Sequence, residues 1–207
     1  MSLSLPADDA GQPGRRERKR QQTADHLADT AWTLFQSHGF DAVTMEAIAA
    51  AADVAKGTLY KHFPVKEALL RHRFHRELAE ALPALLGELS ALPTVTERLQ
   101  GFFRHSAEWS LAHRDYLKEY VRYRLSEVGT PAEQEPGRHS GLDGLFASFI
   151  AAGQASGEYR RGTHPAVLAR YLQFLYLAAL LRWLHEPTLD LQAEFGTVLD
   201  VFLHGIV

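Results

Sequence analysis

The chain has 207 residues, of which 46% are hydrophobic and 23% charged, an ordinary composition for a soluble globular protein of one or two domains. Its formal net charge is −3, so any affinity for nucleic acid must come from local clusters of basic residues. The absence of cysteine excludes disulfides, thiolate metal sites and cysteine nucleophiles.

The amino-terminal residues are expected to form a disordered tail. Residues 1–14 contain prolines and glycines and few large apolar residues. They lack the basic start and apolar core of a signal peptide. The most apolar run of the chain, residues 172–181, is shorter than a membrane span and is flanked by Arg170 and Arg182. We therefore expect a cytoplasmic protein with no membrane partner.

An amphipathic helix is expected at about residues 16–38, because apolar residues recur every three or four positions. Gly39 follows it and is the residue type that most often ends a helix in a left-handed conformation. Residues 15–20 hold five basic side chains and one acidic one. This cluster is either a solvated surface or an arm that contacts phosphates or the minor groove of DNA. The expected apolar face comprises Leu27, Ala31, Leu34 and Phe35.

Two short helices joined by a tight turn are expected next, at residues 45–51 and 55–63. Thr44 can cap the first helix, because its hydroxyl can accept an unpaired N–H of the first turn. Pro64 ends the second, because the residue before a proline disfavours helical geometry. Two short helices in this arrangement are typical of a helix-turn-helix that binds DNA.

The second short helix has the residue types that a DNA recognition helix needs. Gly57 and Thr58 are small enough for the backbone to approach a duplex, and Lys61 can donate to phosphates. Lys56 and Thr58 are candidates for contacts with base edges, since Lys can donate to guanine and Thr can contact a thymine methyl. The side that packs on the rest of the module is expected to contain Phe35, Phe40, Ile48, Val54, Leu59 and Phe63.

Residues in this region resemble the DNA-binding segment of the tetracycline-repressor-like (TetR) family of bacterial regulators. The resemblance covers roughly fifty residues in family order and spacing. It implies phosphate contacts by Thr44, Tyr60, His62 and Lys66, although Tyr60 and His62 could instead be packed in the core. The matching residues are Gly39, Phe40, Thr44, Ile48, Ala49, Val54, Lys56, Gly57, Thr58, Leu59, Tyr60, His62, Phe63, Lys66 and Glu67.

The sequence departs from the family pattern at two positions. Asp53 stands in the turn where the family usually has Gly, and Asp tolerates left-handed geometry better than most residues. Ala55 stands where the family usually has a Ser or Thr cap, a loss of roughly 1 kcal/mol in helix stability. It also removes one expected phosphate contact.

The remainder, residues 64–207, is expected to be helical and to form a larger effector-binding and dimerisation domain after the DNA-binding domain, residues 15–63. No run alternates with period two as a strand would, so the fold class is all-α with about nine helices. A helix from residue 64 should kink or end at Pro83, followed by a linker. The further helices are expected from Thr94 or Thr96 to 113, at 116–126, at 141–156, from the cap Thr163 to 185, and from Thr188 or Asp190 to 205. A linker is expected at 84–93 and a loop at 129–137.

Aromatic side chains at helical spacing between residues 94 and 156 predict either ordinary core packing or the lining of a small-molecule site. Phe102, Ser106 and Trp109 share one face, as do Tyr116, Tyr120 and Tyr123. Buried tyrosine hydroxyls need partners, and rings with a few polar groups are typical of ligand pockets. The resemblance implies an effector site here, for which the candidates are Phe102, His105, Trp109, Tyr120, Tyr123, Phe146 and Phe149.

The last two helices have apolar faces broad enough to leave a large patch exposed in a monomer. Pairing with a second copy would form a four-helix bundle, the mode of dimerisation that the resemblance implies. The alternative is that the pair closes the core of a monomer. The residues expected at the dimer interface are Tyr171, Phe174, Leu175, Ala178, Leu191, Phe195, Val198 and Phe202.

We therefore expect a homodimeric, ligand-released transcriptional repressor that binds a palindromic operator in double-stranded DNA. A non-regulatory architectural or recombinase-type DNA-binding protein is the alternative, although such a protein would not need an aromatic-rich second domain. No Ser-His-Asp set, phosphate-binding loop or dinucleotide-binding turn indicates an enzyme or a cofactor. His72 and His75 lie one turn apart, but no third ligand suggests a metal site.

Overall fold

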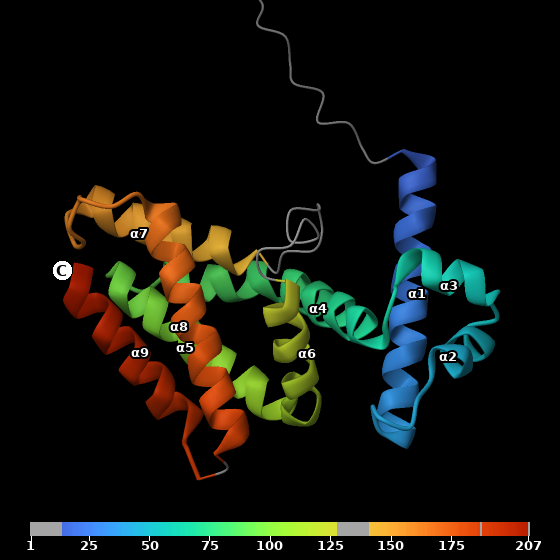
Figure 1. The fold of residues 1–207 in the computed structure, drawn as a ribbon. Coiled ribbons are helices and arrows are strands. Elements are labelled where there is room, and N and C mark those ends of the chain that lie inside the picture. Colours follow the sequence, from blue (N-terminus) through green and yellow to red (C-terminus); the bar gives the residue numbers. More distant parts are fainter. Residues whose placement is uncertain (1–13, 128–140, 187, 207) are drawn as a thin grey trace, which may run out of the picture. The chain divides into compact units, whose positions relative to one another are not determined.

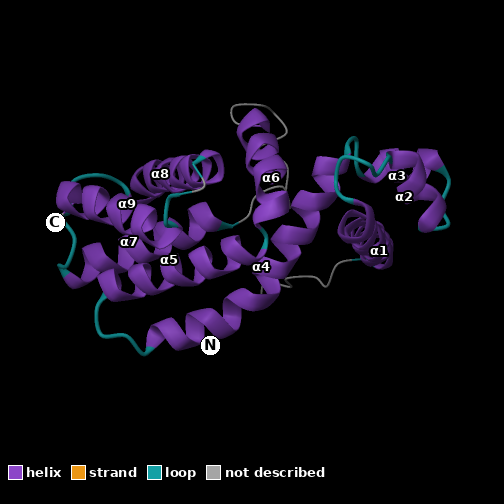
Figure 2. Cartoon of the chain, turned by 90° about the horizontal axis from the view of Figure 1, so that it is seen from below, coloured by secondary structure: helices purple, strands orange, loops and turns teal. Residues whose placement is uncertain are grey.

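A computed structural model describes residues 14–127, 141–186 and 188–206 (Figures 1 and 2). Over these ranges the chain forms nine α-helices and no strand, which confirms the expected all-α fold class. The helices are α1 (Arg15–His38), α2 (Met45–Ala51), α3 (Lys56–His62), α4 (Lys66–Ser90), α5 (Val95–Ala112), α6 (Arg114–Glu127), α7 (Leu142–Ser156), α8 (Pro165–His185) and α9 (Leu191–Ile206).

The chain divides into two compact units, one ending at Leu69 and the other beginning at Leu70. We call the described part of the first the amino-terminal unit and that of the second the carboxyl-terminal unit. Helix α4 begins in the first and continues into the second. The predicted tail, residues 1–14, lies outside the described residues except for Gly14, and the predicted loop at 129–137 lies outside them entirely.

The amino-terminal unit packs α1, α2 and α3 around one apolar core. The apolar face of α1 is buried as expected, with Leu27 and Ala31 fully enclosed, and Phe35 lies against Phe40 with ring centroids 4.8 Å apart. Leu34 is only half-buried at the edge of this face. The short helices contribute Ile48, Ala49, Leu59 and Phe63 to the core.

The turn between α2 and α3 forms despite both departures from the family pattern. Asp53 adopts a left-handed conformation with φ of 53°, as its tolerance of that geometry predicts. Ala55 precedes α3 without any side-chain cap. His26 of α1 supplies a contact that the sequence did not suggest, since its Nε2 lies 3.2 Å from the carbonyl oxygen of Ala52. This contact ties α1 to the end of α2.

Helix α4 does not end at Pro83, and the linker expected at residues 84–93 is wrong for most of its length. The helix continues to Ser90 with Pro83 inside it. Leu82, Leu85 and Leu86 pack against the core of the carboxyl-terminal unit, and Leu89 is buried within it. Burial of apolar residues on both sides of the proline offsets the hydrogen bond that proline cannot make.

The carboxyl-terminal unit is built on a ring of four helices. Helix α5 packs on α7 and α9, and α8 packs on the same two helices, while α6 packs on α8 (Figure 1). Aromatic rings from all four fill the centre. Phe103 stacks on Phe146 at 5.7 Å and meets Phe195 edge to face at 5.2 Å, and Tyr176 stacks on Phe195 at 4.9 Å.

The start of α5 is held by side chains from two places in the chain. Thr94 and Glu97 form a capping box, and the Glu158 carboxylate accepts hydrogen bonds from the N–H groups of Val95 and Thr96, both at 2.8 Å. Partial burial alone would raise the pKa of Glu158. Hydrogen bonds from the side chain and backbone of Thr96 and the backbone of Val95 outweigh that effect, so the pKa lies below its ordinary value.

Helix α8 begins one residue later than expected, and its cap is His164 rather than Thr163. The Nδ1 atom of His164 accepts a hydrogen bond from the Ala166 N–H, and Pro165 occupies the first turn. By length and composition α8 could cross a membrane, and 33% of its most apolar window is buried within the unit. It is nonetheless a member of the four-helix ring, so its apolar residues are shared between a core face and an exposed face.

Candidate nucleic-acid interface and ligand cavity

Helix α3 presents a polar, exposed side opposite its buried side. Leu59 and Phe63, four residues apart, are buried in the core of the amino-terminal unit. Gly57 and Lys61, also four apart, lie on the opposite side of the helix and are exposed. A Cβ atom at Gly57 would meet nothing within 4 Å, so the backbone there is open to close approach. A groove of DNA could therefore approach this side without displacing protein.

The residues predicted to contact DNA lie on the same unit but differ in exposure. Tyr60 is 46% exposed, so packing in the core does not account for its ring. His62 and Lys66 are half-buried. Thr44 also has the capping role expected of it, because its hydroxyl accepts a hydrogen bond from the Ala47 N–H at 3.1 Å. The exposed members are Thr44, Lys56, Gly57, Thr58, Tyr60 and Lys61.

Lys66 differs most from its predicted environment. Its Nζ donates to the carbonyl oxygen of Phe40 at 2.6 Å and lies 3.3 and 3.4 Å from those of Val43 and Asp41. The same ammonium lies 4.4 Å from the centroid of the Phe40 ring. These contacts engage the ammonium group for which the family resemblance implies a phosphate contact. Through these contacts Lys66 joins the start of α4 to the loop before α2.

Charges near the recognition helix come from two places. Lys56 forms an exposed ion pair with Glu46 of α2, with Nζ and Oε1 3.5 Å apart. The basic cluster of residues 15–20 belongs to the first turns of α1 and is exposed throughout. An exposed pair of this kind contributes little to stability and leaves the lysine free to exchange partners.

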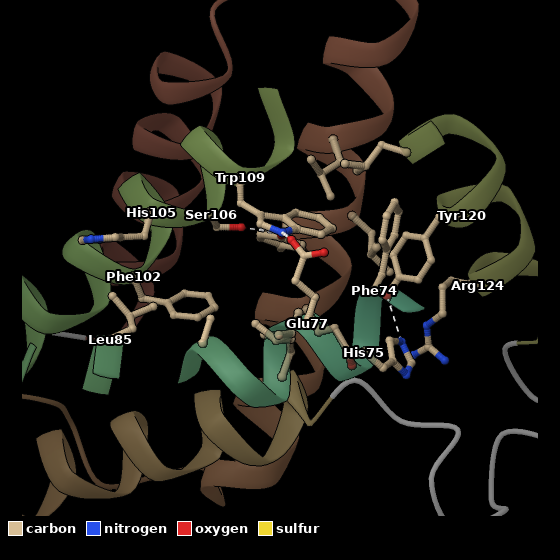
Figure 3. A pocket seen from close by; sticks show the side chains of 18 of the residues that line it. Phe74, His75, Glu77, Leu85, Phe102, His105, Ser106, Trp109, Tyr120 and Arg124 are labelled. Carbon is tan, nitrogen blue, oxygen red and sulfur yellow. Dashed lines mark hydrogen bonds between the residues drawn. The ribbon is translucent and has the colours of Figure 1, made fainter. Parts of the chain in front are cut away.

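A cavity of about 390 Å³ lies entirely within the carboxyl-terminal unit (Figure 3). This volume is within the range of small-molecule sites, roughly 300–1,000 Å³. Its apolar lining consists of Phe74, Leu78, Ala81, Ala84, Leu85, Phe102, Leu117, Leu142, Leu177 and Leu180. Its polar lining consists of His75, Glu77, Glu88, His105, Ser106, Trp109, Tyr120, Arg124, Gln173 and Tyr176.

The carboxylate of Glu77 is held in place from several sides. Trp109 donates its indole N–H to Oε1 at 2.6 Å, and Nε2 of His113 lies 3.3 Å from the same oxygen. Arg73, one turn earlier on α4, lies 3.5 Å from Oε2. Figure 3 shows the contact between Trp109 and Glu77 midway between the two ends of the cavity. A partly buried carboxylate costs free energy unless it is paired, and the Trp109 indole and the Arg73 guanidinium supply the pairing.

Tyr176 is a second polar group whose hydroxyl is satisfied inside the unit. Burial raises the pKa of Tyr176 above its ordinary value, against the opposing effect of hydrogen bonds from Ser106 and Ser110. Its hydroxyl lies 2.6 Å from that of Ser106, which also lines the cavity. The phenol is therefore neutral and can exchange hydrogen bonds with a ligand.

Four of the seven predicted ligand residues line the cavity, and three do not. Phe102, His105, Trp109 and Tyr120 line it, and the Tyr120 hydroxyl lies 3.0 Å from Nε2 of His75. Phe146 and Phe149 are buried outside the lining, where they pack in the core, and Tyr123 lies under the guanidinium of Arg71. Helical spacing places aromatic residues on one face but does not distinguish a filled core from an empty one.

Helix α4 contributes more to the cavity than was expected of it. It lines the cavity with eight side chains, although none of them was among the predicted ligand residues. Their spacing of three or four residues was visible in the sequence, and the small size of two members would have indicated a hollow. These residues are Phe74, His75, Glu77, Leu78, Ala81, Ala84, Leu85 and Glu88.

The residues predicted for a dimer interface divide into exposed and buried groups. Tyr171, Phe174 and Ala178 of α8 are exposed, Tyr171 at 63%, and Val201 of α9 is exposed at 61%. Leu175 and Val198 are half-buried. The expectation is corrected for the buried residues, because their side of α9 already packs on α5 and α8. These are Leu191, Phe195 and Phe202.

Among the described residues, no group of three or more His, Cys, Asp or Glu side chains is placed to hold a metal ion. His75 and His113 have aromatic and hydrogen-bonding neighbours from other helices. The former contacts Tyr120, and the latter stacks on Trp109 with ring centroids 4.2 Å apart.

Comparisons with known proteins agree with the geometry of both units. The sequence model of a family described as "Bacterial regulatory proteins, tetR family" matches residues 27–72. The transcriptional repressor DhaR of Mycobacterium sp. strain GP1 is 28% identical over 86% of this chain and 91% of its own length. The transcriptional repressor KstR of Mycobacterium tuberculosis is 27% identical over 87% and 77%.

A solved structure extends the similarity to the whole fold. The crystal structure of FadR from Thermus thermophilus, described as a transcriptional repressor in complex with lauroyl-CoA, superposes with a TM-score of 0.78 and 27% sequence identity. The superposition covers 89% of this chain and 95% of that one. The helical carboxyl-terminal unit is therefore shared as well as the helix-turn-helix.

Proposed function

The chain belongs to the TetR family of bacterial transcriptional regulators, and on that basis we propose that it is a homodimeric repressor released from a palindromic operator by a small apolar effector. The observation that carries the proposal is the exposed side of α3 opposite Leu59 and Phe63, with Gly57 open to close approach. DNA-binding transcriptional repression is the activity of its named relatives.

In this proposal α3 enters the major groove. Gly57 and Thr58 permit close contact, Lys56 and Thr58 are placed for base edges, and Lys61 and Tyr60 for phosphates. Thr44 and His62 supply further phosphate contacts from beside the recognition helix. Phosphate contacts position the helix, and contacts with base edges supply sequence preference.

The exposed apolar face of α8 supports a homodimer. Val167, Tyr171, Phe174 and Ala178 recur along one side of that helix, and Val201 of the neighbouring α9 is exposed as well. A face of this size is costly to leave in water, and a second copy of the chain would cover it with the same residues. Two recognition helices related by a two-fold axis would contact half-sites about one DNA turn, roughly 34 Å, apart.

The cavity of the carboxyl-terminal unit supports control by a ligand. Its lining is mostly carbon, and it adjoins α4, which is a continuous helix from Lys66 in one unit to Ser90 in the other. A ligand that binds one position of α4 better than another would change operator affinity by that difference. The lauroyl-CoA bound to the FadR of Thermus thermophilus supports an effector with an apolar part.

In this proposal the protein is cytoplasmic and acts without a catalytic step or a cofactor. An architectural or recombinase-type DNA-binding protein is less favoured, because the apolar cavity of the carboxyl-terminal unit would have no role in it. The relatives with which the chain shares most of its length are named repressors or regulators.

Operator selection from random DNA, followed by electrophoretic shift, tests the DNA-binding part. Lys56→Ala and Tyr60→Ala should each weaken operator binding about tenfold, since a lost contact to base or phosphate costs roughly 1–3 kcal/mol. The exposed Lys118→Ala, on α6, should leave it unchanged. Unchanged binding in both Lys56→Ala and Tyr60→Ala would show that α3 is not the recognition helix.

Light scattering tests the assembly. Phe174→Glu should convert a dimer to a monomer, because it places a charge in the apolar face of α8. Leu111→Glu is the matched control, since Leu111 is 52% exposed on α5, outside that face. A wild-type monomer, or a dimer that survives Phe174→Glu, would contradict the proposed interface.

A further inference from the structure

Helix α4 runs along the whole cavity, and its contribution sets the length of the space. The lining residues of α4 begin at Phe74 and end at Glu88. At 1.5 Å per residue, these positions lie about 21 Å apart along the helix axis. The two alanines, Ala81 and Ala84, line the middle of this stretch and are exposed, so their small side chains leave the cavity open there. The cavity is therefore long in the direction of α4.

The cavity is elongated rather than round. Its volume of about 390 Å³ extends past all eight α4 residues that line it, from Phe74 to Glu88. Its lining is mostly apolar along this length. This shape and lining favour a long apolar ligand such as an unbranched hydrocarbon chain.

The two ends of the cavity differ in charge. Figure 3 shows His75, Tyr120 and Arg124 together at one end and His105 with Leu85 and Phe102 toward the other. Glu88 lies 3.7 Å from His105 at that second end, and 70% of its side chain is exposed. An arginine has five N–H donors, so Arg124 can hold an additional acceptor beside its protein contacts. An acidic or carbonyl group is thus favoured at the first end and disfavoured at the second.

We propose that the cavity binds the unbranched acyl chain of a long-chain fatty acid or of its thioester. The carbonyl end lies at His75 and Arg124, and the tail passes Ala81 and Ala84 toward Phe102. This inference rests on the proposed function and names the chemical class of its effector. An extended chain advances about 1.3 Å per carbon, so the space fits a chain of roughly sixteen carbons.

A series of straight-chain acids, each below its micelle concentration, tests the chain. Butanoic, octanoic, dodecanoic and hexadecanoic acids are titrated calorimetrically into the purified full-length protein. Affinity should rise roughly fourfold for each buried methylene and level off near the length of the cavity. The same order should hold for release of the selected operator. An affinity independent of chain length would overturn the proposal, as would tighter binding of a fused four-ring steroid.

A substitution on α4 tests the path of the chain. Ala84→Leu places a larger side chain against the middle of the cavity and should weaken binding of hexadecanoic acid at least tenfold. Ala79→Leu is the matched control, because Ala79 is exposed on α4 like Ala84 but does not line the cavity, and leucine is also a good helix former. Operator binding without ligand should be the same in both variants. Equal affinity of the two variants for hexadecanoic acid would overturn the proposed path.

A substitution at the carbonyl end distinguishes a free fatty acid from its thioester as the ligand. Arg124→Gln should weaken binding of free hexadecanoic acid about tenfold. Binding of hexadecanoyl-CoA should fall less, because its carbonyl carries no charge. An equal tenfold loss for the acid and for hexadecan-1-ol would contradict the placement of the carboxylate. A protein that binds its operator and is released only by ring compounds would overturn this inference alone, whereas one that binds no operator would overturn the proposed function.

Discussion

The two units of the molecule use their apolar residues differently. In the amino-terminal unit, the core side of α3 is filled by Leu59 and Phe63, and the residues proposed to contact DNA lie on the opposite, exposed side. In the carboxyl-terminal unit, the residues proposed to contact a ligand share helices and even faces with the core. Phe102 is buried in the aromatic cluster and also lines the cavity.

This difference implies different responses to mutation. A substitution on the exposed side of α3 should change DNA affinity without changing stability, since few packing contacts are lost. A substitution beside the cavity changes both, because packing and ligand contacts are made by the same atoms. Substitutions in each unit test this contrast.

Among the described glycines, Gly153 of α7 leaves the least room for a side chain. A Cβ atom there would lie 2.2–2.8 Å from atoms of the Tyr159 ring, so Gly153→Ala should lower the free energy of unfolding by about 3 kcal/mol. Gly144→Ala on the same helix is the control, because its Cβ would meet nothing within 4 Å. That substitution should stabilise the helix slightly. Denaturant unfolding measures both, and equal effects would show that the ring moves aside at no cost.

Lys66 tests whether a basic residue of the amino-terminal unit is structural. Lys66→Met should lower the free energy of unfolding by about 1–2 kcal/mol, because the contacts with the carbonyls of Phe40, Asp41 and Val43 are lost. The slope of operator affinity against salt concentration should stay unchanged if this lysine makes no phosphate contact. A slope reduced by about one unit would return Lys66 to the DNA interface.

Glu158 gives the carboxyl-terminal unit a measurable pH dependence. Glu158→Gln should lower the free energy of unfolding by about 1 kcal/mol at neutral pH, through weaker capping of α5. The pKa of Glu158 is lowered in the folded state, so its contribution is complete above the ordinary value of 4.5 and is lost as pH falls through the folded value. The difference between wild type and variant should therefore shrink in acid. A difference independent of pH would show that the charge of the carboxylate is not involved.

The smallest effect is expected at the exposed pair between Glu46 and Lys56. Glu46→Gln should change the free energy of unfolding by well under 1 kcal/mol, since both side chains are at least half exposed. Operator affinity should rise a few fold, because Lys56 loses a competing carboxylate and the surface becomes less negative. Glu80→Gln on α4 is the control for the change in total charge. Equal effects of the two substitutions would place Lys56 away from the DNA.

More of the amino-terminal unit than of the carboxyl-terminal unit could be predicted from the sequence. The capping by Thr44, the left-handed Asp53 and the order of α1 to α3 could be predicted, because each depends on residues within one turn or a few positions. The continuation of α4 beyond Pro83 could not, because leucines on both sides of the proline are stabilised by partners far away in sequence. The burial of Leu191, Phe195 and Phe202 on α9 could not be predicted for the same reason, because their partners lie on α5 and α8.

By itself the sequence determined the helical fold, the position of the helix-turn-helix and the residue types of the recognition helix. These properties follow from hydrophobic period, caps and turn residues, which act over short distances along the chain. The tertiary structure alone decided which aromatic residues fill the core and which surround a cavity. It also gave Lys66 three carbonyl partners and left one side of α8 exposed. Packing between distant helices sets the volume between them, and no local pattern of residues encodes that volume.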